Sequence, residues 1–538
     1  MKRILVIQLC RLGDLLQTTP MLRGLRRMHP GAHVTLMVLD GFSRTPVSAR
    51  LFDTLAVFPF DTVAAEMHAR DSWPQAVQTM RTFVRSLGEE PFDLVLNVTG
   101  NEVANLLSAI VPSRDVRGGL IAPDRTRVVR HPWMTYFWSS LLARESGAVN
   151  LVDLFSRVAE VPVDDEGLEL EVPASAHDAA AKWLADRGHH GGPLVALQLG
   201  ASEDRKRWQP EQFAAMANRL PARLGPVVLV GSAAEGPLAA RAIARLDRPY
   251  FDATGATSLT ELAALLSRAS LLVTNDTGTM HVATAMGTRI VDLSTGPVFV
   301  HETGPYAVGS IAVEPSSGCF PCAAGAVCRH LTCRDDFTPE EIAAVAVFAL
   351  EGGTMPRPAR ARVLRAARSA SGRMEFRTVW DPAATSVSDM RHALARMWES
   401  SLGFVPPIQR AAGADTVPHD IDPALLDALA GLESRAREAS ALARRLSRSA
   451  GQAVTELAAT IEARLERELT AAVVAPVLAP LVAYLRTALD SLTDRSVGTL
   501  ADAYHREWAA TAARARSLHE ELSRGSAARM PVAERVRG

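Results

Sequence analysis

Residues 271–287 read LLVTNDTGTMHVATAMG, and this stretch predicts a strand, a short polar loop and a helix. The apolar run that ends at Thr274 is uninterrupted, which is typical of a buried parallel strand. The small residues from Thr279 to Met286 favour a helix directly after the loop. Because the first N–H groups of a helix lack partners and its dipole is positive there, this helix start can attract an anion. An ordinary capped turn is the alternative.

The composition is that of a globular protein. With 538 residues the chain is long enough for two to four domains, and it has 48% hydrophobic and 22% charged residues. Its 58 Lys and Arg residues balance 59 Asp and Glu residues, so no nucleic-acid partner is expected. Residues 1–50 differ, with eight basic and two acidic side chains. This local excess suits either an anionic partner or a solvated helix surface.

Neither a signal peptide nor a membrane span is expected. Met1 is followed almost at once by a short apolar run that ends at the polar Gln8, with no small-residue cleavage site. The longest apolar stretch, residues 471–485, contains two prolines and is shorter than the roughly 20 residues that a spanning helix needs. We therefore expect a cytoplasmic protein.

The alternation of strands and helices occurs in two blocks. The first block opens with a strand at residues 3–9, which ends at Gly13-Asp14 and is followed by helical apolar spacing that Pro20 interrupts. The second block begins with a strand at residues 194–199. Functional groups of open α/β sheets collect beyond the carboxyl ends of strands, so Asp14 is a candidate site residue. No Gly-x-Gly-x-x-Gly follows the first strand, which argues against a Rossmann dehydrogenase.

These motifs together resemble glycosyltransferase family 9, the ADP-heptose:lipopolysaccharide heptosyltransferase family. The resemblance covers about residues 1–350. The residues that carry it are Leu12-Gly13-Asp14, Thr19-Pro20, Gly200-Ala201-Ser202, Lys206-Arg207-Trp208 and the run from Asp276 to Ala283.

The resemblance implies a GT-B fold, in which two Rossmann-like α/β domains face a cleft. We expect an acceptor-side domain at residues 1–170, a nucleotide-sugar-binding domain at 190–352 and an all-α extension at 360–525. The implied activity is inverting transfer of a heptose or similar sugar from an ADP-sugar to a hydroxyl of a cell-envelope glycan, lipid-linked or capsular. A protein (autotransporter-type) heptosyltransferase and a non-catalytic GT-B scaffold are the alternatives.

The resemblance also implies roles for individual residues. Asp14 is expected to be the general base. Lys206 and the amides of Thr277, Gly278 and Thr279 are expected at the donor diphosphate. His281 is expected near the cleft on the same helix, and a packed or capping histidine is the alternative for it. The full set of expected donor-binding residues is Gly13, Lys206, Gly231, Glu235, Asp276, Thr277, Gly278, Thr279 and His281. No cofactor is expected for the chemistry.

Four of the five cysteines cluster at Cys319, Cys322, Cys328 and Cys333. Disulfides are disfavoured in a cytoplasmic chain, so this spacing predicts a structural four-thiolate site for zinc or iron. Reduced structural thiols and stress-formed disulfides are the alternatives. The cluster also resembles the iron-binding finger of the autotransporter heptosyltransferase branch.

The last third of the chain has helical apolar repeats with interleaved charges, which predict a helical bundle or short coiled coil over residues 360–538. Residues 415–422 are interpreted as a linker. Self-association into a homo-oligomer is the first expectation for these helices, docking to a partner or to the inner membrane face is the second, and an inert cap is the third.

Overall fold

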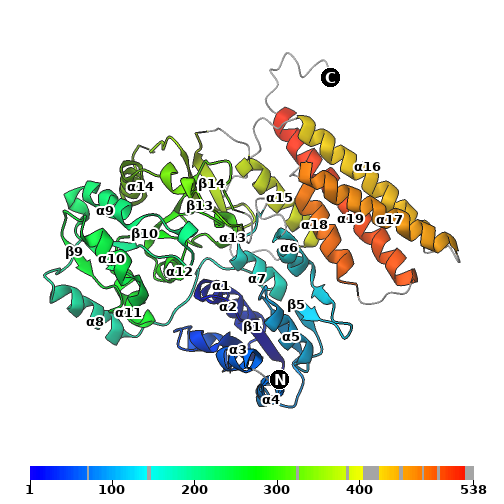
Figure 1. Cartoon of the computed structure of the whole chain (residues 1–538), viewed down its shortest axis with the longest axis horizontal. Coiled ribbons are helices and arrows are strands. Elements are labelled where there is room, and N and C mark those ends of the chain that lie inside the picture. Colours follow the sequence, from blue (N-terminus) through cyan, green and yellow to red (C-terminus); the bar gives the residue numbers. More distant parts are fainter. Residues whose placement is uncertain are drawn as a thin grey trace.

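The computed structural model describes residues 1–69, 72–141, 147–322, 326–354, 356–382, 387–403, 423–446, 452–474, 478–492 and 497–527. Within these ranges the chain forms two α/β units side by side, and a group of long helices packs beside the first unit (Figure 1). The linker predicted at residues 415–422 lies outside the described residues.

A six-stranded sheet forms the centre of the first unit. Its strands are β1 (Arg3–Gln8), β2 (His33–Leu39), β3 (Thr54–Phe58), β4 (Leu94–Asn97), β5 (Val116–Ile121) and β6 (Arg127–Arg130). They lie in the order β3-β2-β1-β4-β5-β6, and all pairs are parallel except β5 with β6. The apolar side chains from Ile4 to Ile7 are fully buried, because helices cover both faces of a parallel sheet.

Among the described residues, seven α-helices belong to this unit. They are α1 (Leu12–Gln17), α2 (Thr19–Met28), α3 (Phe60–His68), α4 (Trp73–Ser86), α5 (Glu102–Ile110), α6 (Pro132–Ser140) and α7 (Leu151–Ala159). Helices α2, α6 and α7 pack on one face of the sheet, and α3, α4 and α5 pack on the other. The predicted interruption at Pro20 is confirmed, since α2 begins anew at Thr19 with Pro20 in its first turn, where a missing N–H is tolerated.

The second unit contains an eight-stranded sheet. Its strands are β7 (Val195–Gln198), β8 (Val227–Val230), β9 (Tyr250–Asp252), β10 (Leu271–Asn275), β11 (Arg289–Leu293), β12 (Ile311–Pro315), β13 (Ala361–Arg368) and β14 (Met374–Trp380). The order is β14-β13-β12-β11-β10-β7-β8-β9, with antiparallel pairing only from β12 to β14.

Helices flank this sheet on both faces. They are α8 (Ala174–Ala185), α9 (Pro210–Arg219), α10 (Gly236–Ile243), α11 (Leu259–Leu266), α12 (Gly278–Ala285), α13 (Val300–Thr303) and α14 (Pro339–Glu351). Helices α8, α11 and α12 pack on one face, whereas α9, α10 and α14 pack on the other. Helix α11 begins with a capping box, in which Ser258 and Glu261 are in reciprocal contact.

In both sheets the strand order reverses beside the first strand, so that later strands are added on its other side. In the first unit β1 lies between β2 and β4, and in the second unit β7 lies between β8 and β10. Connections on the two sides of such a point leave the sheet in opposite directions, so a crevice opens at the carboxyl ends of the strands. The segments after β1, β7 and β10 therefore occupy the positions where α/β proteins bind ligands.

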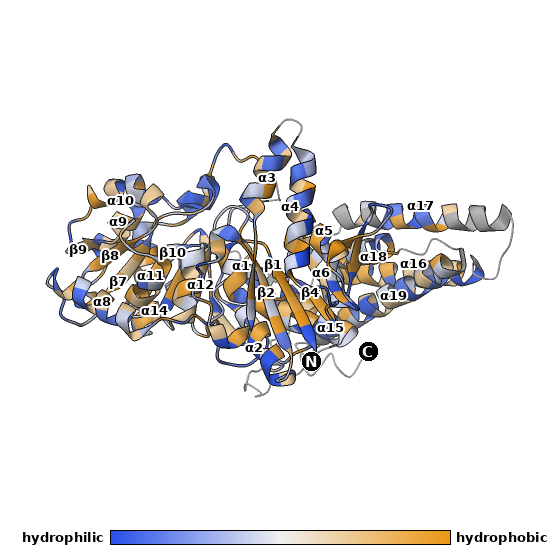
Figure 2. Ribbon diagram, turned by 90° about the horizontal axis from the view of Figure 1, so that it is seen from below, coloured by the Kyte–Doolittle hydropathy of each residue, from blue (hydrophilic) through white to orange (hydrophobic). Residues whose placement is uncertain are grey.

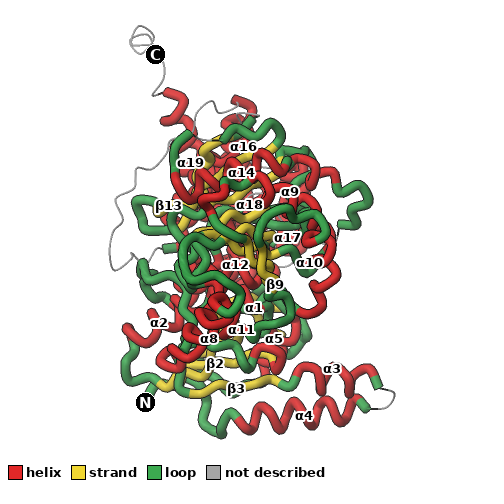
Figure 3. The backbone as a smooth tube through the Cα atoms, turned by 90° about the vertical axis from the view of Figure 1, so that its left-hand side faces the viewer, coloured by secondary structure: helices red, strands yellow, loops and turns green. Residues whose placement is uncertain are grey.

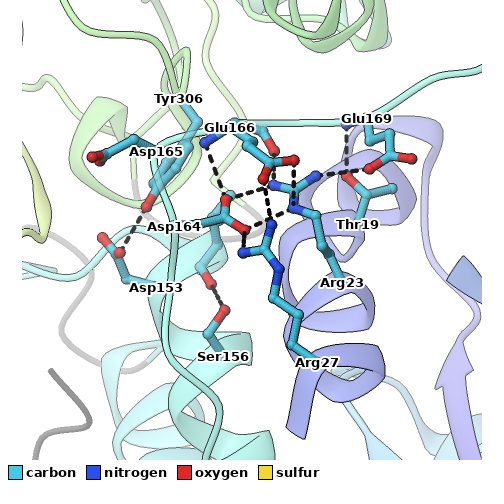
Figure 4. Close-up of polar contacts among 12 residues, drawn as sticks. Thr19, Arg23, Arg27, Asp153, Ser156, Asp164, Asp165, Glu166, Glu169 and Tyr306 are labelled. Atoms are coloured by element: carbon cyan, nitrogen blue, oxygen red, sulfur yellow. Dashed lines mark hydrogen bonds and ion pairs between the residues drawn. The ribbon is translucent and has the colours of Figure 1, made fainter. Parts of the chain in front are cut away.

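Arg23 of α2 holds the segment that connects the two units (Figure 4). Its guanidinium donates to both carboxylate oxygens of Asp164, at 2.7 and 2.8 Å, and to Glu169 at 2.8 Å. The backbone N–H of Glu169 donates to the hydroxyl of Thr19 at 2.9 Å. Because Arg23 is only 5% exposed, these bonds fix the path of the connection against α2.

Residues 361–380 depart from the expectation of an all-helical C-terminal part. They form the antiparallel strands β13 and β14, which extend the second sheet beyond β12. The turn between them contains Gly372 with φ of 82°, a conformation that glycine adopts readily. The Ala- and Arg-rich sequence favours a helix locally, but pairing with β12 and burial of Phe376 override that preference.

In the part of the chain that the structure describes, five helices follow the hairpin: α15 (Val387–Leu402), α16 (Pro423–Leu446), α17 (Gln452–Val474), α18 (Ala479–Asp490) and α19 (Val497–Ala527). Together they form the helical extension. Trp398 of α15 is fully buried, and its ring centroid lies 5.5 Å from that of Tyr136 in α6 and 5.0 Å from that of Tyr484 in α18. The extension thus shares one apolar core with the first unit. Its self-association stays a prediction.

The apolar residues gather inside the molecule, as the orange strands of the first sheet illustrate (Figure 2). Helices α3 and α4 form a hairpin that stands out from the body (Figure 3). Trp73 on this hairpin is 64% exposed. None of the helices in the described ranges has the length and hydropathy needed to cross a bilayer.

Candidate active site

The predicted corner at residues 271–287 forms β10 and α12, and the start of α12 faces the first unit. Thr277 is the N-cap residue, and the N–H groups of Gly278 and Thr279 belong to the first turn, where intrahelical partners are missing. The hydroxyl of Thr277 is buried and has no hydrogen-bond partner within the described structure. This helix start therefore presents unsatisfied donors beside the carboxyl end of the sheet.

Helix α1 of the first unit meets α12 directly. Asp14 lies in the first turn of α1, and the backbone N–H of Arg11 donates to its Oδ2 at 3.1 Å. A Cβ atom on Gly13 would lie only 2.6 Å from Cδ2 of His281, and one on Gly278 would lie 3.1 Å from Cδ2 of Leu12. The two helix starts approach this closely because each has a glycine at the contact.

A pocket of ≈ 160 Å³ lies where these helix starts meet. Its lining comes from both units and consists of Arg11, Gly13, Asp14, Gln17, Ser202, Lys206, Asp276, Thr277, Gly278, His281 and Thr303. Seven predicted site residues are among them, from the segments that follow β1, β7 and β10. The structure thus brings the candidate base and most of the candidate donor-binding residues to one place. Thr279, Gly231 and Glu235 do not line this pocket.

Lys206 enters the pocket from a 3₁₀ turn, η4 (Asp204–Lys206), that follows β7. The side chain is largely buried, and its Nζ lies 2.5 Å from Oδ2 of Asp276. Asn275 holds the surrounding loops together, since its Oδ1 accepts from the Trp208 N–H at 2.9 Å and its Nδ2 donates to the Leu199 carbonyl at 3.0 Å. An ammonium is therefore fixed beside the start of α12.

Gly231 and Glu235 lie at the end of β8, next to β7 in the sheet. The carboxylate of Glu235 accepts from the backbone N–H of Ser232 at 2.6 Å and from Nε2 of Gln198 at 3.2 Å. A Cβ on Gly200 would lie 1.3 Å from Oε1 of Glu235, so only glycine fits there. Glu235 thus organises the neighbouring loop, away from Asp14.

Burial shifts the pKa values of two pocket residues, Asp14 and His281. It raises the pKa of Asp14, while the backbone N–H and the charge of Arg11 oppose the increase. Burial also lowers the pKa of His281 from 6.5 to about 4, so its imidazole is neutral near pH 7. The Nδ1 atom of His281 is buried without a hydrogen-bond partner among the described residues.

Asp292 is a buried acid near the site that the sequence analysis missed. It lies on β11 beside Thr274 of β10 and is fully buried, and its Oδ2 accepts from the Ser294 hydroxyl at 2.6 Å. Burial, with the nearby charge of Asp276, raises its pKa to about 8. The only signal in the sequence is an acid inside the apolar run Ile290 to Leu293, which a surface turn would explain equally well.

The clustered cysteines lie near one another between β12 and α14. Cys333 is buried and Cys319 is exposed. Burial raises the pKa of the Cys333 thiol, and neighbouring thiol groups, chiefly that of Cys322, add to the increase. Within the described residues, however, no three His, Cys, Asp or Glu side chains converge to hold a metal ion. The four thiols are therefore neighbours without being arranged as ligands in this structure, and the four-thiolate site stays a prediction. Cys10 is separate, and burial raises its pKa to about 11.

Comparison with known proteins gives consistent matches. Residues 80–328 match the sequence model of glycosyltransferase family 9 (heptosyltransferase). Lipopolysaccharide heptosyltransferase 1 of Pseudomonas aeruginosa is 26% identical over 334 residues, which are 60% of this chain and 86% of that protein. Lipopolysaccharide heptosyltransferase 3 of Escherichia coli is 23% identical over 291 residues, which are 52% of this chain and 80% of that protein.

Residues 80–328 thus carry the sequence pattern of glycosyltransferase family 9. A solved family 9 structure from Veillonella parvula has the same fold, with a TM-score of 0.51 and 23% identity over 65% of this chain and 97% of that one. The protein is thus a glycosyltransferase with the GT-B fold. Lys206, Asp276 and His281 lie within the residues that match family 9, whereas Asp14 precedes them and the helical extension follows them.

Proposed function

We propose that this family 9 enzyme transfers a heptose, or a similar sugar, from an ADP-sugar to a hydroxyl of a cell-envelope glycan in lipopolysaccharide synthesis. The names of its curated relatives support the sugar and the acceptor class. One observation carries the proposal: Asp14 from the first unit and Lys206 from the second line a single pocket with the start of α12. A candidate base and a candidate diphosphate site are thereby held within one small volume.

Asp14 is the general base in this proposal. It accepts the proton of the acceptor hydroxyl as that oxygen attacks the anomeric carbon and the bond to the diphosphate oxygen breaks, which inverts the configuration. The raised pKa of Asp14 supports this role, because a carboxylate with a higher pKa is a stronger base at neutral pH. ADP leaves on the opposite side of the sugar.

The diphosphate is stabilised from the second unit. Lys206 supplies a positive charge, and Thr277, Gly278 and Thr279 supply first-turn N–H groups with the positive end of the helix dipole. These groups act where negative charge grows on the leaving ADP, which is where fixed donors lower a barrier most. Asp276 holds Lys206 at the pocket when no donor is bound.

The remaining candidates have supporting roles. The neutral His281 packs against Gly13 and so sets the spacing between the two helix starts. Gly231 and Glu235 lie one strand further along the sheet, which supports contact with the ribose or base of ADP rather than with the diphosphate. The chain requires no cofactor for this chemistry.

Asp14→Asn tests the proposed base, because it keeps the size of the side chain and removes its basicity. We expect kcat to fall about 10²- to 10⁴-fold while ADP affinity is kept. Asp61→Asn is the matched control, since Asp61 is exposed on α3. The assay follows nucleotide release from ADP-, UDP- and GDP-sugars, and NMR of the product gives the anomeric configuration. Undiminished activity of Asp14→Asn, or retained configuration, contradicts this mechanism.

The same assay separates the alternatives. Transfer to a protein hydroxyl in place of a glycan would assign an autotransporter-type heptosyltransferase. Absence of binding by every nucleotide would favour a scaffold that uses the helical extension for assembly. Cell fractionation tests the proposed cytoplasmic location with peripheral contact to the inner membrane face.

We also propose that Cys319, Cys322, Cys328 and Cys333 bind a structural zinc or iron ion. Their proximity supports it, since the other thiol groups raise the pKa of Cys333. Elemental analysis of the purified chain and of Cys322→Ser gives the test. A metal content near zero in both proteins would leave reduced thiols as the explanation.

A further inference from the structure

The cysteines lie in an unusually long connection between β12 and α14. Residues 316–338 form it, whereas most strand-to-helix connections need about 2–6 residues. The start and the end of this connection meet at Asp336, whose side chain is almost fully buried. The Ser317 N–H donates to Asp336 Oδ2 at 3.0 Å, and Arg360 forms an ion pair with Oδ1 at 2.9 Å. The connection is therefore anchored to the second unit at its base.

Residues inside this connection contact the turn that carries Lys206. Arg334, which is 5% exposed, donates from Nη2 to Oδ2 of Asp204 at 2.7 Å and also to the Asp204 carbonyl oxygen. In the opposite direction, Nη1 of Arg205 donates to the carbonyl oxygen of Ala326 at 2.5 Å. Arg334 of the connection and Arg205 of the turn thus link the two segments by hydrogen bonds.

A backbone contact adds to this link. The Cys322 N–H donates to the carbonyl oxygen of Gly296 at 2.9 Å. A Cβ on Gly296, whose φ is 66°, would lie 2.8 Å from the carbonyl oxygen of Arg205. The hydroxyl of Thr295 donates to that same oxygen at 3.2 Å. The turn is therefore enclosed between residues 295–296 and the cysteine-bearing connection.

We propose that Arg334 is a positioning residue for Lys206. It fixes the turn Asp204–Lys206, and through this turn it directs the ammonium toward the donor diphosphate. The inference deepens the proposed function and rests on it for the identity of the ligand. Arg334 does not line the pocket, so it acts through Asp204 rather than by touching the donor.

Two backbone hydrogen bonds close the turn itself. The Lys206 N–H donates to the Glu203 carbonyl at 3.1 Å, and the Arg207 N–H donates to the Asp204 carbonyl at 3.0 Å. The Asp204 side chain is 65% exposed, so water competes for it, and besides Arg334 it meets Arg207 at 3.2 Å. Of the two guanidinium groups that contact Asp204, the buried one of Arg334 is screened less by solvent than that of Arg207.

Arg334→Gln removes this support, and Arg329→Gln is the matched control. Arg329 lies in the same connection, is exposed, and has no hydrogen bond or ion pair within the described structure. For the full-length protein we expect calorimetry to give an ADP Kd about 5- to 30-fold higher in Arg334→Gln and unchanged in Arg329→Gln. Arg334→Lys, which keeps the charge, should recover part of the affinity.

A double-mutant cycle separates positioning from general loss of structure. If Arg334 acts through Lys206, Arg334→Gln has no further effect on ADP affinity once Lys206→Ala is present. An equal loss in both backgrounds overturns the proposal, and so does an unchanged Kd in Arg334→Gln.

Hydrogen exchange distinguishes this inference from the proposed function. Without nucleotide, the amides of residues 203–208 should exchange faster in Arg334→Gln than in wild type and Arg329→Gln. That result together with no ADP binding by wild type would reject the ADP-sugar donor and keep the positioning contact. Unchanged exchange would refute the positioning role, whatever nucleotide binds.

Discussion

Adding one methyl group at Gly13 should force apart the two helix starts that form the pocket. The new Cβ would lie 2.6 Å from Cδ2 and 3.0 Å from Nε2 of His281, whereas non-bonded carbon atoms normally stay about 3.5–4.0 Å apart. His281 is only 4% exposed, so its ring has little room to turn away. Either α1 or α12 must then move by about 1 Å. Such overpacking costs about 1–3 kcal/mol, and a 1 Å displacement at a site can reduce turnover about 100-fold.

Urea unfolding and steady-state kinetics of Gly13→Ala test this expectation. Gly31→Ala is the control, because a Cβ there meets nothing within 4 Å. Shortening the opposing ring should relieve the clash, so the double variant Gly13→Ala with His281→Ala should lose less free energy of unfolding than the two single losses combined. The reasoning is refuted if Gly13→Ala keeps both its stability and its kcat, or if the two losses simply add.

Three further predictions concern pH and the helical extension. Between pH 6.5 and about 4, His281 is neutral in the folded protein and gains a proton on unfolding. The free energy of unfolding should therefore fall by about 3 kcal/mol in total as the pH is lowered through this range. Urea titrations of His281→Gln should show a weaker dependence of this free energy on pH. Because the pKa of Asp14 is raised, kcat/KM should decline on the acid side with a midpoint above 3.8, and the residual activity of Asp14→Asn should lack this limb. Trp398→Ala should cost about 3–5 kcal/mol in the same unfolding assay, whereas Trp73→Ala, at a side chain 64% exposed, should stay within about 0.5 kcal/mol; equal losses would contradict the shared core.

Local patterns were sufficient to predict much of the fold. The strand at residues 3–9 and the interruption at Pro20 depend on neighbours in the sequence, and both are confirmed. Two α/β units with a helical extension were likewise predicted. The hairpin at residues 361–380 was missed, because its pairing partner is the distant strand β12 and its own composition favours a helix.

The site was predictable only in part, because it too depends on contacts between residues that are distant in the sequence. The rule for open sheets made Asp14 a candidate at the end of the first strand, and the resemblance to glycosyltransferase family 9 added Lys206 and Asp276. The contact of Gly13 with His281, and the support of the Lys206 turn by Arg334, join residues that are far apart in the chain. No local signal encodes such contacts, because they depend on how the two units and the cysteine-bearing connection pack.

The shared core of the first unit and the helical extension affects how the protein is made. Leu518 and Leu522 of α19 belong to the same apolar cluster as Ile4 of β1. At about 5–20 residues per second, roughly tens of seconds of synthesis separate the emergence of the first unit from that of α19. During this time the helical extension does not yet cover the face of the first unit around Trp133 and Tyr136. The nascent chain therefore presents an apolar surface for chaperones until α19 has been synthesised, and a product ending before α15 would keep that surface exposed.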